Sequence, residues 1–133
     1  MATWVKLYNL RDLSDLGIAT AHLGDFTQAA ALFHEALILV QELNNTYDIA
    51  VCLLGVAGVQ RSLNRTAQLL AAARATFERS GEVVEPLYRI ELERTENKIH
   101  EVLDEQDFAK FSAEGRAMTV EQAIGFAMEG REN

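Results

Sequence analysis

Only one proline, Pro86, interrupts a chain of 133 residues. Proline breaks helices more strongly than any other residue, and glycine, the next strongest, occurs only eight times. A backbone with so few breakers favours long helices over the turn-rich chain of an all-β protein. Apolar side chains also recur at steps of three and four residues, the spacing that places them on one face of a helix. The sequence therefore predicts an all-α protein.

Turn and capping signals divide this pattern into successive helices. Asparagine, aspartate, serine and threonine mark helix starts because their side chains accept backbone N–H groups, and glycine marks helix ends. The expected helices are residues 1–23, ending at Gly24; a helix capped by Asp25 with Gln28 that fades near Leu43; one opened by Asn44, Asn45 and Thr46; one capped by Asn64 and stopped by Gly81; one from Pro86 to about Leu103; one capped by Asp104 and stopped by Gly115; and one opened by Thr119 with Gln122.

The sequence contains an internal repeat. Leu16-Gly17 and Leu54-Gly55 each lie near the middle of an expected helix, and aligning them also brings Ala29 onto Ala67. A glycine in mid-helix costs about 1 kcal/mol in helix propensity, so its use here indicates close approach of a neighbouring helix. We expect two helix pairs to nest through these small residues, with Phe33 filling the space between them, because one pair cannot bury both of its apolar faces.

These positions resemble the signature of the tetratricopeptide repeat (TPR) family. The match is good in residues 10–43, although Leu13 and Thr20 replace two aromatic residues, and it is weaker in residues 47–80. The resemblance implies antiparallel helical hairpins of TPR-like type, stacked as a short right-handed superhelix. The matching residues are Leu13, Leu16, Gly17, Gly24, Phe26, Ala29, Phe33 and Ala36.

A second resemblance covers residues 50–128. This stretch is similar to the C-terminal segment of LuxR-type and related ATPase-containing bacterial transcriptional regulators, most specifically in the FxxxxxxGRAMTVEQA spacing from Phe108 to Ala123. It implies a C-terminal repeat-and-cap segment, excised from or related to a larger regulator. Because the chain also has the length of one domain, we expect residues 1–133 to form a single helical-repeat domain that ends in the C-terminal helices of residues 86–129. The resemblance does not imply ATPase or DNA-binding activity, because the sequence has no phosphate-binding loop and no basic recognition helix.

Charge and composition exclude several functions. The formal net charge of −8 disfavours nucleic acid and anionic membrane partners, which need clustered basic residues. No apolar run approaches the length of a membrane span and no signal peptide is apparent, so we expect a cytoplasmic protein.

Catalytic and metal-binding patterns are also missing from the sequence. Cys52 lies in an apolar run and is expected to be a buried core residue. His22, His34 and His100 lack metal-ligand spacing, and the acidic residues of 91–107 alternate with basic ones as on a solvated helix face. We expect no enzyme activity, no cofactor and no metal.

The TPR resemblance implies a binding groove, because the first helix of each hairpin lines a concave surface in that family. Half of its residues here are apolar, so the groove either binds a partner segment or is covered by the chain's own helix at 86–103. Carried over by position, the groove consists of Arg11, Ser14, Ile18 and His22 from the first repeat and Ile49, Cys52, Val56 and Gln60 from the second.

An apolar cluster near the N-terminus either packs on the first hairpin or forms an exposed edge for self-association, since the ends of helical repeats need polar caps. The expected function is therefore a non-enzymatic module for protein–protein interaction or self-assembly, whose partner is a protein, a peptide or a second copy in a homodimer. The alternative is a ligand-sensing segment of a larger transcriptional regulator. The cluster consists of Trp4, Val5, Leu7 and Tyr8.

Overall fold

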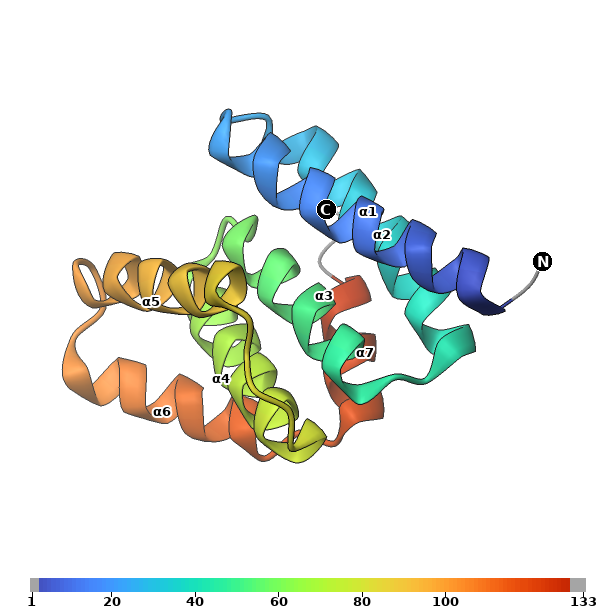
Figure 1. Ribbon diagram of the computed structural model, residues 1–133. Helices are drawn as coiled ribbons and strands as arrows, with labels where there is room; N and C mark the ends of the chain where they lie inside the picture. Colours follow the sequence, from blue (N-terminus) through green and yellow to red (C-terminus); the bar gives the residue numbers. More distant parts are fainter. Residues whose placement is uncertain (1–2, 130–133) are drawn as a thin grey trace.

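The computed structural model describes the backbone of residues 3–129 and the side chains of residues 9–129, and this part of the chain is all helical (Figure 1). The all-α prediction is confirmed. No described helix combines the length and the apolar character that a bilayer span requires. The helices are α1 (Thr3–His22), α2 (Phe26–Leu43), α3 (Thr46–Gly58), α4 (Leu63–Ser80), α5 (Pro86–His100), α6 (Glu105–Arg116) and α7 (Val120–Glu129).

Most of the expected helix ends are confirmed by their capping contacts. The Asp25 carboxylate accepts the Gln28 N–H at 3.1 Å at the start of α2. Thr119 and Gln122 form a reciprocal capping box before α7, with distances of 2.9 and 3.1 Å. Gly81 ends α4 in the left-handed conformation that glycine adopts without strain, at φ 71°.

Three expected boundaries were wrong. Ser62 caps α4 through its hydroxyl, which accepts the Arg65 N–H, and Asn64 lies inside the first turn. Helix α5 ends at His100, three residues before Leu103. Gly115 does not stop α6, which continues by one residue; instead Gly115 is buried against α4.

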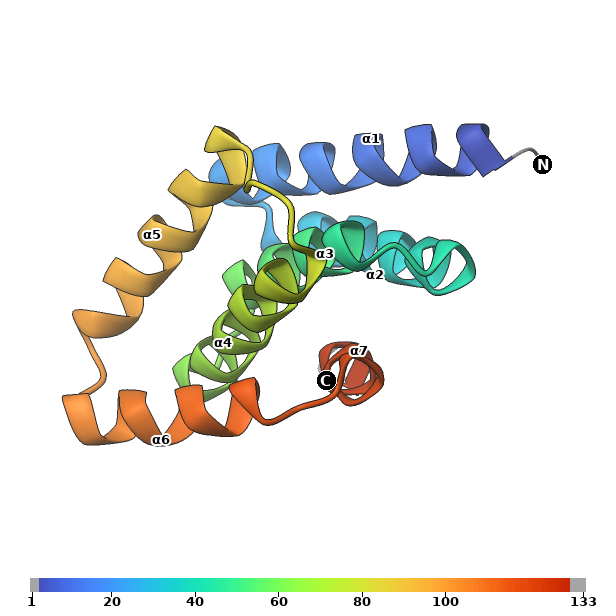
Figure 2. The same cartoon turned by 60° about the horizontal axis from the view of Figure 1, so that its bottom comes forward.

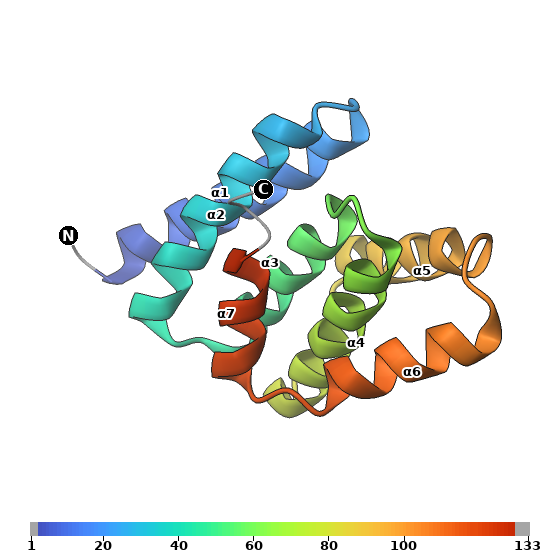
Figure 3. The ribbon, with the colours of Figure 1, turned by 180° about the vertical axis from the view of Figure 1, so that it is seen from behind.

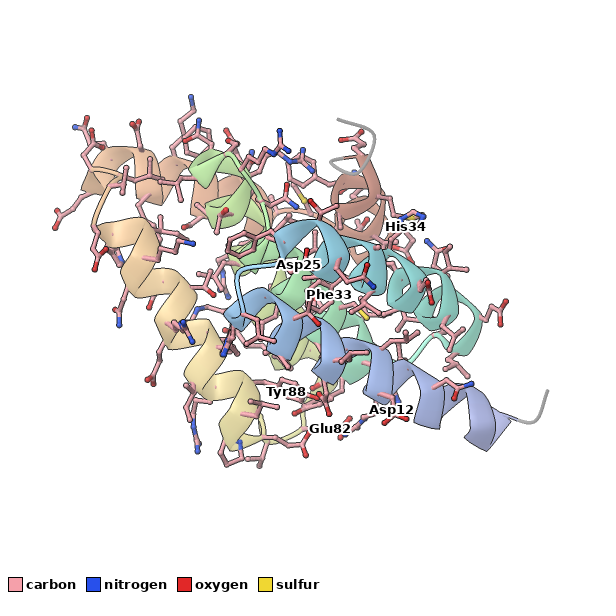
Figure 4. The ribbon with its side chains drawn as sticks, turned by 90° about the horizontal axis from the view of Figure 1, so that it is seen from above. Asp12, Asp25, Phe33, His34, Glu82 and Tyr88 are labelled. Carbon is pink, nitrogen blue, oxygen red and sulfur yellow. The ribbon has the colours of Figure 1, made fainter. Side chains whose placement is uncertain are left out.

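The two helix pairs nest around a single aromatic ring. Consecutive helices α1 and α2 pack together, as do α3 and α4, and α3 contacts both helices of the first pair. Figure 4 labels Phe33 on α2. Its ring lies between Gly17 and Gly55, where an ideal Cβ at Gly17 would be 2.7 Å from the ring and one at Gly55 closer still. Ala29 and Ala67 are 0% and 1% exposed. The predicted role of the small residues is confirmed.

The remaining helices surround the second pair. Helix α6 packs extensively on α4, and α5 runs from beside α1 to the start of α6 (Figure 2). Helix α7 returns to pack on α3 and α4 and reaches α2 (Figure 3). The polar middle of α5 predicted solvent on most sides, and most residues of this helix are exposed. Its one buried stripe has helical spacing and consists of Tyr88, Leu92, Thr95 and Ile99.

Candidate functional site

Five of the eight groove residues are buried within the fold. Ser14 Oγ and Cys52 Sγ lie 3.9 Å apart where α1 meets α3, and both side chains are at most 2% exposed. Ser14 and Cys52 therefore belong to the packing between the two first helices, where a partner has no access to them. The buried groove residues are Ser14, Ile18, Ile49, Cys52 and Val56.

Arg11 is exposed, but it is engaged by the chain's own carboxylates. Its Nε lies 3.3 Å from Asp48 Oδ1, and its Nη1 lies 3.3 Å from Glu85 Oε2. Burial raises the pKa of the Asp48 carboxyl, and the facing Arg11 guanidinium partly offsets that rise. The Tyr47 hydroxyl accepts the Glu85 N–H at 3.0 Å and fixes the segment before α5.

The first turn of α5 is held against α1 and α3 by a buried tyrosine. The Tyr88 hydroxyl donates to Asp15 Oδ1 at 2.8 Å, and its ring meets Tyr47 edge-on at 6.2 Å. Burial raises the pKa of the Tyr88 hydroxyl, so it remains a donor. The sequence did not predict that Asp48, Glu85 and Tyr88 would meet the groove residues. Partners that lie so far apart in the chain share no local sequence pattern.

His22 is also covered by α5. Its Nε2 lies 2.7 Å from Glu91 Oε1. The Arg94 guanidinium approaches both ring nitrogens almost equally, at 3.2 and 3.4 Å, which indicates that it lies over the face of the imidazole. Helix α5 thus occupies the side of α1 on which Arg11 and His22 were expected to meet a partner.

A cavity of about 240 Å³ remains beside this contact. Three groove residues reach it: Ile18, His22 and Gln60. Its inner wall is apolar and includes Phe33 and Leu54. It is therefore a partly open remnant of the expected groove between α1, α3 and α5.

A larger and more open hollow of about 890 Å³ lies between α2, the turn before α4 and the end of α7. Val56 and Gln60 line it together with the half-exposed Phe26. His34 also lines it, and its Nδ1 has no hydrogen-bond partner among the described residues. Sequence reasoning placed His34 on an ordinary helix face, and nothing in the local pattern distinguished it.

The expected self-association edge lies outside the side chains that the structure describes: Trp4, Val5, Leu7 and Tyr8. Two large apolar side chains are exposed, however, one on α1 and one in the turn directly after it. Leu16 is 55% and Leu23 is 87% exposed. On the neighbouring helix, Ile38 is 46% exposed.

Within residues 9–129, no group of three His, Cys, Asp or Glu side chains is placed to hold a metal ion. The described residues define an all-α protein that has a small cavity, a larger open hollow and several exposed apolar side chains. Comparison of the chain with protein-family models, curated proteins and solved structures finds no match.

Cys52 is expected to be unreactive while the protein is folded. Burial raises the pKa of its thiol to about 12, so little of the nucleophilic thiolate forms near neutral pH. We expect its reaction with Ellman's reagent at mildly alkaline pH to be about a thousandfold slower in the native protein than in urea. A rate in the native protein that equals the rate in urea would contradict the packing of α1 on α3.

Proposed function

We propose that this chain is a non-enzymatic, TPR-like helical-repeat module that binds another protein or a second copy of itself in the cytoplasm. The observation that carries the proposal is the exposed apolar surface of the first helix pair. The 38-residue repeat and the two nested pairs support the TPR-like assignment, and the resemblance of residues 50–128 supports a relation to bacterial transcriptional regulators.

The two exposed leucines, Leu16 of α1 and Leu23 of the turn that follows it, form one stripe, because the Leu23 N–H still donates to the Ala19 carbonyl as in a helix. Leu16 and Leu23 are seven residues apart, which is about two turns of a helix, so they lie on the same face. Fully burying a leucine is worth roughly 1.5–3 kcal/mol, so two such side chains give a partner a substantial apolar contact. Exposed apolar patches often mark interaction sites. We name the surface formed by Leu16 and Leu23 the outer face.

The TPR-like arrangement indicates what would cover the outer face. In a stack of helical hairpins, each unit buries its apolar sides against its neighbours. The first pair already packs on α3 through Phe33, so the outer face is where a further helical unit would add. That unit is supplied either by a partner protein or by a second copy.

Removing both leucines should weaken this association. In sedimentation velocity, we expect the apparent mass of the wild-type protein to rise with its concentration. In the double variant that carries both Leu16→Gln and Leu23→Gln, the same rise should require concentrations at least about tenfold higher. Val102→Gln is the matched control, because Val102 is 68% exposed at the other end of the fold. Both variants should melt near the wild-type temperature, since the replaced side chains are exposed.

Two results would count against the proposal. A strictly monomeric wild-type chain at the highest concentrations would exclude self-association. Binding of a different protein can be tested with a photo-crosslinking residue placed at position 16 or at position 102 and irradiated in cells. If position 16 captured no more protein than position 102, the outer face would be excluded as the binding surface.

A further inference from the structure

We propose that the cavity between α1, α3 and α5 binds a small organic anion with an apolar body, such as an aromatic or short aliphatic carboxylate. This site is distinct from the outer face and does not depend on it. Its volume of about 240 Å³ lies just below the range of roughly 300–1,000 Å³ typical of drug-sized pockets, so the ligand must be small.

The inner wall of the cavity is suited to an apolar body. Ile18, Phe33 and Leu54 provide apolar surface, and the Phe33 ring is held in place between two glycines. Small residues, Ala21 and Gly58 among them, leave the space open. A Cβ added at Gly58 would meet no atom within 4 Å.

The mouth of the cavity carries two cations that have no carboxylate partner among the described residues. Lys98 has one contact, with its ammonium 5.8 Å from the centre of the Phe26 ring. Arg94 lies over the face of His22, and its Nη1 is 3.4 Å from Nδ1, the ring nitrogen that can accept from it while Nε2 faces Glu91. The other guanidinium donors of Arg94 and the ammonium of Lys98 remain available to a ligand.

Two cations without a carboxylate partner in the described part of the chain are unusual in a protein with so many acidic residues, and this supports an anion-binding role. The chain has 20 acidic and 12 basic residues, so a basic side chain has many carboxylates to pair with. The one acidic residue that lines the cavity, Glu91, is bonded to His22. An anionic group at the mouth would gain charge-assisted hydrogen bonds to Arg94 and Lys98 while its body displaces water from the apolar wall.

Binding can be measured with defined probes. We would titrate ¹⁵N-labelled protein with phenylacetate and with hexanoate, and compare each carboxylate with the corresponding neutral amide. Physiological salt screens non-specific attraction between the carboxylate and the basic side chains of the surface. We expect saturable shifts of the Ala21, Ala57 and Gly58 amide signals, and binding of each carboxylate about tenfold tighter than that of its amide.

Variants separate the two parts of the site. Arg94→Gln should weaken carboxylate binding about tenfold and leave amide binding unchanged, because it removes charge but not apolar wall. Arg89→Gln is the matched control, as Arg89 is exposed on the same helix and does not line the cavity. Ala21→Phe should abolish binding of both probes by filling the cavity from its partly buried position on α1.

The Leu16→Gln and Leu23→Gln variant should bind the probes as the wild type does, which distinguishes failure of this site from failure of the outer face. The proposal is overturned if neither carboxylate gives saturable shifts at the cavity by about 10 mM. Equal binding of carboxylate and amide, or equal weakening by Arg89→Gln and Arg94→Gln, would also overturn it.

Discussion

Gly55→Ala is expected to lower the free energy of unfolding by about 2–3 kcal/mol, although alanine is the better helix former. The added methyl group would collide with the Phe33 ring, and the ring cannot retreat because Gly17 packs on it from α1. Relief requires α1, α2 and α3 to separate slightly, with loss of contact across the interface between the two pairs. Urea denaturation followed by far-UV circular dichroism measures the change.

Gly58→Ala is the matched control for this prediction. Gly58 lies three residues further along α3, and an added Cβ there would meet open space. We expect it to leave stability unchanged or to raise it by about 0.5–1 kcal/mol, since alanine reduces the entropy of the unfolded chain. If the two variants lost equal stability, the effect would come from the helix and not from Phe33.

A double-mutant cycle isolates the contact itself. Phe33→Leu alone should destabilise the protein, because a smaller side chain leaves space between Gly17 and Gly55. In that background, Gly55→Ala should be nearly harmless, so the two changes should be strongly non-additive. Additive losses would show that the methyl group and the ring do not meet.

Gly115→Ala should destabilise the protein at least as much, by about 3 kcal/mol or more. The added methyl group would overlap the backbone carbonyl oxygen of Gln68 in α4, and a backbone atom cannot rotate away as a side chain can. Its Cβ would also lie 3.0 Å from that of Ala71. Helix α6 would therefore have to move off α4, its main packing partner. Urea denaturation measures the loss, and faster amide hydrogen exchange in α6 locates it.

Gly125→Ala in α7 is the control for this second prediction. Gly125 is exposed, and a Cβ there would meet nothing within 4 Å. The change should stabilise α7 by about 0.5–1 kcal/mol through helix propensity. A Gly115→Ala variant that behaves like Gly125→Ala would show that α6 does not pack on α4 as the structure describes.

The contacts at the centre of the fold were easier to predict from the sequence than the contacts near its surface. The repeat of small residues predicted the contact around Phe33, because a glycine in mid-helix has few uses other than close approach. The same reasoning treated Gly115 as a helix stop. Both roles suit glycine, and only the position of α4 distinguishes them.

The groove residues were likewise only partly predictable from the sequence. Arg11 and His22 were correctly placed on the first helix, and covering of the groove by the helix at 86–103 was one of the two expectations, but the sequence did not indicate which residues would meet them. Arg11 bonds to a residue 74 positions away, and His22 to one 69 positions away. The cavity with Arg94 and Lys98 at its mouth likewise depends on where α5 crosses α1 and α3.

The sequence by itself determined the helices, most of their caps and the small residues through which the two pairs nest. These features depend on partners within about one helical turn, as in the Thr119 and Gln122 box, or on a repeat that is visible in the chain. Only the tertiary structure decided which groove residues are buried, which cations lack a partner and which apolar side chains of α1 face outwards. Those outcomes depend on how distant helices pack, because burial and ion pairing are properties of neighbours in space and not of neighbours in sequence.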